Sequence, residues 1–84
     1  MRYQVIIPKS VRKKLDRFPA GLTERILEAL AGLETNPRPP GCKKLKDREA
    51  YRVRVGDYRI IYEIYDRVLQ VVVITVGHRR EVYR

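Results

Sequence analysis

The feature that most constrains this fold is a pair of alternating runs joined by Gly56-Asp57. The runs cover residues 51–55 and 58–62, and apolar side chains alternate with basic ones along most of their length. Such alternation is typical of strands with one buried face. Gly at the first position of a two-residue turn can take the positive φ that a tight hairpin needs. The sequence therefore predicts an antiparallel hairpin that turns at Gly56-Asp57.

This turn fixes a register for the hairpin. Val55 should face Tyr58, and the pairs that follow should be Arg54–Arg59, Val53–Ile60, Arg52–Ile61 and Tyr51–Tyr62. One face then forms the core side, with Tyr51, Val53, Val55, Tyr58, Ile60 and Tyr62, and the other carries Arg52, Arg54 and Arg59. Directly opposed like charges destabilise a sheet. An anion held between Arg54 and Arg59 would account for their pairing.

Two amphipathic helices are expected before this hairpin. Ser10 is a plausible N-cap for the first, which places Val11, Leu15 and Phe18 on one side and basic residues on the other. After a break at Pro19-Ala20-Gly21, the second helix runs to Asn36-Pro37. Its apolar stripe should contain Leu22, Ile26, Leu30 and Leu33, widened by Leu27 and Ala29. The pattern predicts a helical hairpin that covers one face of a sheet.

Four strands are expected, near residues 2–8, 50–56, 58–66 and 68–77. Residues 37–50 lack periodicity and should form a loop with a basic second half. A turn at Asp66-Arg67 would set Glu63 opposite Gln70, and Gly77 should end the last strand. We predict a single α+β domain over residues 1–84, with the helical hairpin on one face of a mostly antiparallel four-stranded sheet. The pattern leaves the partner of the first strand open.

Composition restricts the partners and the chemistry. The 84 residues have a formal net charge of +9, which indicates a polyanionic partner, either nucleic acid or an acidic protein, or else a solvated basic surface. Cys42 is the only cysteine, so no internal disulfide or cysteine-cluster metal site can form. This suits a reducing cytoplasm. With no membrane-length apolar run and no signal-peptide pattern, we expect a cytoplasmic protein that does not enter membranes.

The available side chains suit one kind of catalysis. Paired carboxylates, metal-ligand spacing, a Gly-rich phosphate loop and a Ser/His/Asp set are all missing from the pattern, so we expect no metal and no cofactor. A metal-independent ribonuclease needs only arginine to stabilise the phosphorane formed by 2′-OH attack, and histidine or tyrosine for proton transfer. His78 and Tyr83 are candidates, although the first could be an ordinary loop residue and the second a packing residue.

Three segments carry a resemblance to a known family. They are residues 51–62, the stretch Val73-Ile74-Thr75-Val76-Gly77-His78-Arg79, and the closing Glu81-Val82-Tyr83. Together with the order of predicted elements, they resemble the RelE/ParE superfamily of toxins, and more specifically RelE-type mRNA interferases. The resemblance implies a toxin that enters the ribosomal A site, cuts mRNA there and is silenced by an antitoxin.

The same resemblance implies roles for individual residues. Arg59 would contact the scissile phosphate, Arg79 would stabilise the transition state, and Tyr83 would stack on or orient a base. Arg52 and Arg54 stand where well-known members carry lysines, and arginine is a poor base because it stays protonated. Either these two act only electrostatically, or His78 or Tyr83 is the base. We further assign RNA binding to Arg52, Arg54, Lys43, Lys44, Lys46 and Arg80.

The resemblance also implies an antitoxin partner, which we expect to present an acidic segment to the sheet or the first helix and to displace the C-terminal tail. Two other functions remain open from the sequence. A ParE-like toxin would inhibit DNA gyrase by binding and would have no nuclease activity. A basic nucleic-acid-binding module would have no catalytic activity of any kind.

Overall fold

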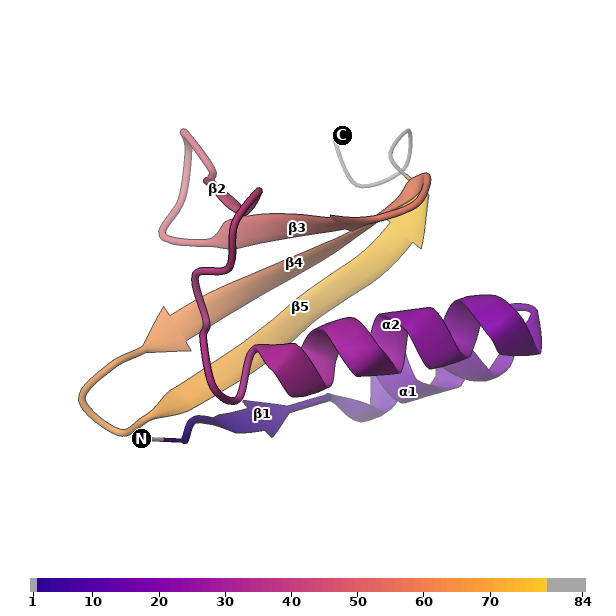
Figure 1. Ribbon diagram of the computed structural model, residues 1–84, viewed down its shortest axis with the longest axis horizontal. Coiled ribbons are helices and arrows are strands. Elements are labelled where there is room, and N and C mark those ends of the chain that lie inside the picture. The colour runs from indigo at the N-terminus through magenta and orange to yellow at the C-terminus, as the bar shows by residue number, and fades with distance from the viewer. Residues whose placement is uncertain (1, 79–84) are drawn as a thin grey trace.

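A computed structural model describes residues 2–78 of the chain. Its elements are β1 (Gln4–Ile6), α1 (Lys9–Asp16), α2 (Ala20–Gly32), β2 (Lys43–Lys44), β3 (Tyr51–Val55), β4 (Tyr58–Tyr65) and β5 (Gln70–His78). Both helices lie on the same side of the sheet (Figure 1). The predicted α+β fold, a helical hairpin on one face of a mostly antiparallel sheet, is therefore confirmed.

The sheet has the strand order β1-β5-β4-β3-β2. The sequence left the partner of the first strand open, and the structure pairs β1 in parallel with β5, through Gln4–Gln70, Val5–Val71 and Ile6–Val72. All the other neighbouring strands are antiparallel. A parallel pair needs a crossover connection, and here the two helices form its first part (Figure 1). The longest strands, β4 and β5, lie at the centre of the sheet.

The central hairpin has the predicted register throughout. All five expected pairs of β3 and β4 are present, from Val55–Tyr58 at the turn to Tyr51–Tyr62 at the far end. Gly56 has a φ of 59°, the left-handed conformation that its position requires. The side chains of Arg52, Arg54 and Arg59 therefore share one face of the hairpin, as the alternation indicated.

The predicted register of β4 with β5 is wrong. We expected a turn at Asp66-Arg67 with Glu63 opposite Gln70, but Glu63 pairs with Val72 and Gln70 pairs with Tyr65. The connection is a four-residue turn over residues 66–69, and Leu69 has a φ of 52°. Tight two-residue turns need positive φ at one or both central positions, and Asp-Arg offers no glycine for this purpose. The shift is two residues, so Glu63 keeps its predicted face.

A β-bulge interrupts the same strand pair. Tyr62 pairs with Val73 but the adjacent Ile61 pairs with Thr75, so Ile74 is the extra residue on β5. The fully buried valines of this strand accordingly fall at Val71, Val73 and Val76, with a spacing of two and then three. After the bulge, the β5 side chains therefore point to the other face of the sheet from the one that uninterrupted alternation would predict. The strand also continues one residue past Gly77, to His78.

The loop over residues 37–50 contains a strand that we did not predict. Lys43 and Lys44 pair with Arg52 and Tyr51, which makes a five-stranded sheet where four strands were expected. Two exposed lysines bury no side chain, so no hydrophobic periodicity could have indicated this strand.

The helix boundaries differ from the predicted ones at three points. Ser10 is not the N-cap, because α1 begins at Lys9 directly after Pro8. The second helix begins at Ala20 after Pro19, so Gly21 lies inside it. Proline fixes φ near the helical value and is favoured at helix starts, which explains why both helices follow one. Helix α2 ends at Gly32, before the expected stop at Asn36-Pro37.

The core lies between the helices and the sheet. Helix α1 contributes Val11 and Leu15, and the sheet contributes chiefly Ile60, Tyr62, Val71, Val73 and Val76. From α2 and its C-cap come Ile26, Leu30 and Leu33, as predicted, with Leu22 and Ala29 partly buried against them. Leu27, which we expected in the same stripe, is 44% exposed. In the described part of the chain, no helix is long and apolar enough to cross a membrane.

Candidate nucleic-acid interface

Arg52, Arg54 and Arg59 define the arginine face, the side of the sheet away from the helices. Their neighbours along the strands, Val53, Val55 and Ile60, belong to the hydrophobic core or pack against it. Successive side chains of a strand point to opposite faces, so the three arginines point away from the helices. Arg54 is exposed, and Arg52 and Arg59 are half-buried. The orientation that we predicted for these side chains agrees with the structure.

Two like charges on this face, Arg54 and Arg59, are direct cross-strand partners. In a hairpin with a two-residue turn, the pair next to the turn exchanges hydrogen bonds and the following pair does not. Arg54–Arg59 is that following pair, the class in which opposed side chains lie closer together. Across the other edge of β4, Arg59 faces Gly77, which has no side chain. The Nε atom of Arg59 is buried in this setting.

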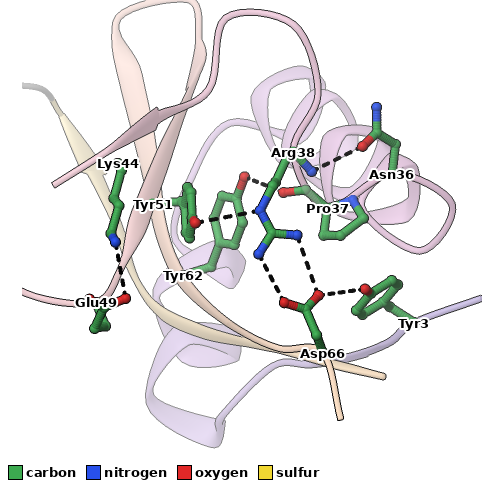
Figure 2. A network of polar contacts seen from close by, with 9 residues as sticks. All are labelled: Tyr3, Asn36, Pro37, Arg38, Lys44, Glu49, Tyr51, Tyr62 and Asp66. Carbon is green, nitrogen blue, oxygen red and sulfur yellow. Dashed lines mark hydrogen bonds and ion pairs between the residues drawn. The ribbon is translucent and has the colours of Figure 1, made fainter. Parts of the chain in front are cut away.

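A second cross-strand row extends the positive charge to the sheet edge. Lys43 pairs with Arg52, Arg52 with Ile61, and Ile61 with Thr75, so these side chains share the arginine face. Lys44 pairs with Tyr51 instead, and its Nζ lies 3.2 Å from a carboxylate oxygen of Glu49 (Figure 2). Lys46 is exposed in the loop that follows. Of the three loop lysines, only Lys43 is therefore in register with the arginines.

A negative charge bounds the arginine face on β4. Glu63 lies on the same face, and its carboxylate accepts hydrogen bonds from the Tyr65 hydroxyl at 2.7 Å and from Arg48 at 3.4 Å. The bond to Glu63 raises the pKa of Tyr65 above its usual value. The sequence did not predict this network, although the alternation of side chains along β4 already placed Glu63 on the same face as Arg59. Glu63 thus places a negative charge on the β4 side of this face, next to the row of arginines.

The structure separates His78 from the arginine face. His78 is the cross-strand partner of Tyr58, and the two rings meet edge to face with centroids 5.6 Å apart. Tyr58 in turn packs on Phe18, next to the end of α1, at 5.1 Å. His78 therefore points to the helix side of the sheet, while Arg59 points to the opposite side. The three other C-terminal candidates, Arg79, Arg80 and Tyr83, lie outside the described residues.

A network of polar contacts anchors the loop that leads into β2, and Figure 2 shows these contacts from close by. The Arg38 guanidinium donates to both carboxylate oxygens of Asp66, at 3.0 and 3.3 Å, and Tyr3 donates to the same carboxylate at 2.6 Å. Arg38 also donates to the Tyr51 hydroxyl at 3.4 Å. These bonds, first that of Arg38 and then that of Tyr3, hold the pKa of Asp66 below its usual value. The sequence offered no signal for this network, because its members are far apart in the chain.

A buried hydrogen bond fixes the start of the same loop. The Tyr62 hydroxyl donates to the backbone carbonyl of Pro37 at 2.8 Å, and both residues are buried. Burial is the main cause of the raised pKa of Tyr62, with the nearby Cys42 thiol adding to it. Tyr62 is therefore neutral at physiological pH and serves as a structural donor. Within residues 2–78, no three of His, Cys, Asp and Glu come together as a metal site would require.

Comparison with known proteins places this architecture in one group. A family model described as "ParE toxin of type II toxin-antitoxin system, parDE" matches residues 5–83. The chain is 36% identical to the putative toxin RelE1 of Methanocaldococcus jannaschii over 75 residues, which cover 82% of this chain and 83% of that protein. It is 32% identical to toxin RelG of Mycobacterium tuberculosis, covering 100% of this chain and 99% of the relative.

Solved structures agree with the sequence relatives. The structure of the archaeal RelE-RelB complex from Pyrococcus horikoshii matches with a TM-score of 0.86 and 32% identity, over 96% of this chain and 99% of that chain. The similarity thus extends over nearly the whole chain in the family model, in the relatives and in the fold.

Proposed function

Since this chain belongs to the RelE/ParE superfamily of toxins from type II toxin–antitoxin systems, we propose that it is an endoribonuclease that cuts mRNA in the ribosomal A site. One observation carries the proposal: the sheet presents three arginines on the side away from its core, with Arg54 and Arg59 directly opposed. Directly opposed like charges repel each other, and a phosphate bound between the two guanidinium groups would lessen that repulsion. Arginine's planar fork suits bidentate contact with phosphate.

The proposed reaction needs no group beyond those that the chain supplies. The 2′-oxygen attacks the adjacent phosphorus and loses its proton, the P–O5′ bond breaks, and the departing 5′-oxygen takes up a proton. Arg59 is proposed to stabilise the negative charge of the phosphorane, helped by Arg79. Arg52, Arg54 and Lys43 are proposed to hold the flanking phosphates, with Lys44, Lys46 and Arg80 as further RNA contacts.

The position of His78 bears on the proton-transfer step. Because His78 packs on Tyr58 at the helix side of the sheet, it lies on the wrong side to reach a phosphate held by Arg59. Arg52 and Arg54 stay protonated and cannot serve as bases. We therefore propose Tyr83, which the family resemblance assigns to the substrate base, for proton transfer.

The family also supports a protein partner for this chain. The P. horikoshii relative was solved as a RelE-RelB complex, and this chain is proposed to bind a cognate antitoxin as well. With a formal net charge of +9, it should attract an acidic segment. Such a segment on the arginine face would exclude RNA and silence the toxin.

Cleavage of ribosome-bound mRNA by purified variants tests the proposal. Arg59→Ala and Arg79→Ala should each reduce the rate by roughly a hundred- to a thousandfold, the usual cost of losing a donor to a developing oxyanion. Arg67→Ala is the matched control, because Arg67 is exposed in the turn between β4 and β5. Full activity of both variants would refute these assignments.

Two further variants separate the candidate bases. Tyr83→Phe keeps the ring for stacking but removes the hydroxyl, so it should lower the rate if Tyr83 transfers a proton. His78→Gln should leave the pH profile of cleavage unchanged. If cleavage by wild type falls as the pH drops and cleavage by His78→Gln does not, His78 is the base. Our proposal that Tyr83 transfers the proton would then be wrong.

The alternative is inhibition of DNA gyrase without nuclease activity, and the match to the ParE toxin model favours it. A wild-type protein that arrests growth and inhibits gyrase supercoiling without cutting any mRNA would establish this alternative.

A further inference from the structure

Gly77 differs from the rest of the strand that contains it. The six residues before it, from Val71 to Val76, are valine, isoleucine or threonine, which are all β-branched and suit a strand. Glycine weakens the interior of a strand, because it loses the most backbone entropy on folding and has no side chain to pack. Yet β5 continues through Gly77 to His78, and Gly77 pairs with Arg59. A glycine inside a strand often marks a bulge, a bend or a close approach.

The backbone does not require glycine at this position. Among the described residues, the glycines with positive φ are Gly41 and Gly56, whereas Gly77 lies in the extended backbone of β5, which other L-amino acids adopt as readily. The β-bulge of this strand is at Ile74, three positions earlier. Neither a turn nor the bulge explains the glycine, so the missing side chain is itself the feature to account for.

The missing side chain leaves room beside Arg59. On one edge of β4, Arg59 faces Arg54, and on the other it faces Gly77, so all three residues lie on the arginine face. The Cβ atoms of directly opposed residues are about 4.5–5.5 Å apart. Any side chain at position 77 would therefore stand next to that of Arg59. With glycine there, the surface of β5 beside Arg59 is bare backbone.

Charge and burial both indicate that Arg59 lies over Gly77. Repulsion from Arg54 favours rotamers that carry the Arg59 guanidinium away from β3, and β5 is the strand on that side. Arg59 is half-buried with a buried Nε atom, although Arg54 on the same face is exposed. Gly77 is itself buried. Arginine packs its aliphatic stem along neighbouring surface, and an Arg59 side chain stretched across the glycine would cover both groups.

We propose that Gly77 is a positioning residue for RNA cleavage, because its missing side chain leaves the seat in which the Arg59 side chain lies. This inference rests on the proposed function and adds to it a residue that acts through Arg59. With its stem fixed across β5, the guanidinium is held in one place for the scissile phosphate. Such preorganised donors stabilise developing charge without rearranging during the reaction. A misplacement of about 1 Å can lower a rate about a hundredfold.

Gly77→Ala tests this proposal, with Gly21→Ala as its matched control. The new Cβ at position 77 would stand beneath the Arg59 side chain and displace it. An added Cβ at Gly21, in α2, would meet no described atom within 4 Å beyond its chain neighbours and the backbone of its own helix. Alanine favours folding over glycine inside a regular element, so neither variant should lower the midpoint of thermal unfolding. We measure this midpoint, and kcat and KM for cleavage of ribosome-bound mRNA.

The expected result for Gly77→Ala is a fall in kcat of at least about tenfold, with KM within about twofold of wild type. Gly21→Ala should match wild type in both constants. A fully active Gly77→Ala variant would overturn the proposal. Loss of thermal stability together with loss of rate would show that the fold itself requires the glycine, and would also overturn it.

Two double-mutant cycles show through which residue Gly77 acts. If it positions Arg59, Gly77→Ala should cause no further loss of rate in an Arg59→Ala background. It should keep its full effect in an Arg79→Ala background, which excludes an effect passed along the chain to Arg79. An undiminished loss in the absence of Arg59 would mean that position 77 contacts the RNA itself. That result, or coupling to Arg79 alone, would overturn the proposal.

Failure of the proposed function is distinguishable from failure of this inference. The Nε–H group of Arg59 gives an NMR signal, which is assigned by its loss in Arg59→Ala. Because this atom is buried in wild type, its proton should exchange slowly with water, and faster in Gly77→Ala. If wild type cuts no mRNA, this measurement still decides whether Gly77 seats Arg59. Equal exchange in wild type and Gly77→Ala would refute the inference even where cleavage is found.

Discussion

Arg54→Gln should make the isolated toxin more stable while weakening its proposed ribonuclease activity. Arg54 lies directly opposite Arg59 on the outer side of the β3–β4 hairpin, and it is exposed. Its replacement by glutamine keeps a long polar side chain and opens no cavity. The substitution therefore isolates the repulsion between the two charges.

The size of the effect follows from the geometry of the pair. Backbone positions of such a non-hydrogen-bonded pair are about 4.5 Å apart, and two flexible guanidinium groups can diverge to about 8 Å. In water, unit charges repel by roughly 0.5 kcal/mol at 8 Å and 1 kcal/mol at 4 Å. Opposed cross-strand charges in sheets give effects of about 0.2–1 kcal/mol. We expect a stabilisation of about 0.5 kcal/mol at low salt.

Urea unfolding at low salt is the appropriate assay, because guanidinium chloride is itself a salt and would screen the interaction. With a slope of about 1–2 kcal/mol per molar urea, the midpoint should rise by a few tenths molar. Arg54→Lys keeps the charge and should leave the midpoint near wild type. Arg67→Gln removes a charge elsewhere and controls for net charge. The gain should vanish near 1 M salt, where the Debye length is about 3 Å.

Inorganic phosphate at constant ionic strength completes the test. A ligand that binds only the native state raises stability, so phosphate should stabilise wild type more than Arg54→Gln. The reasoning is refuted if Arg54→Gln destabilises the protein at low salt, or if phosphate stabilises both proteins equally. Either outcome would show that the opposed arginines do not form an anion site.

Two further predictions concern the contacts that position the loop before β2. Tyr62→Phe removes the buried hydroxyl that donates to the Pro37 carbonyl at 2.8 Å, and should cost about 1–3 kcal/mol in urea unfolding because a buried acceptor loses its donor; a loss below about 0.3 kcal/mol would contradict this. Asp66→Asn should destabilise the protein at neutral pH but not in acid. The folded pKa of Asp66 is lowered, first by Arg38 and then by Tyr3, so its contribution is present above the ordinary aspartate pKa of about 4 and disappears as pH falls through the folded value. A pH-independent difference between wild type and Asp66→Asn would disprove the role of this charge.

The sequence predicted those parts of the fold in which local patterns and packing agree. Gly56-Asp57 specified both a turn and a register, and the alternation on either side specified the same faces. Buried positions of the helices, such as Leu15 and Leu30, followed from helical spacing. These are local properties, because each can be recognised within a window of about ten residues.

The parts that the sequence did not predict depend on backbone pairing or on distant contacts. Lys43 and Lys44 join the sheet through their main chain, and neither side chain has a property that would predict a strand. The ion pair between Arg38 and Asp66 joins residues 28 positions apart. Leu69 adopts a left-handed conformation that is rare for leucine. A leucine at this position therefore does not predict the four-residue turn between β4 and β5.

The bulge in β5 shows how such a gap in prediction affects the candidate site. Counting from Val71 and Val73 on the core side, strict alternation would direct His78 to the arginine face, where it could serve as a base. The extra residue at Ile74 reverses the faces beyond it, so Val76 is buried and Gly77 faces Arg59. One inserted residue thus removes a histidine from the site and sets a glycine beside the central arginine. The hairpin end of this face thus carries arginines and no histidine, and for this reason the proposed mechanism assigns proton transfer to Tyr83.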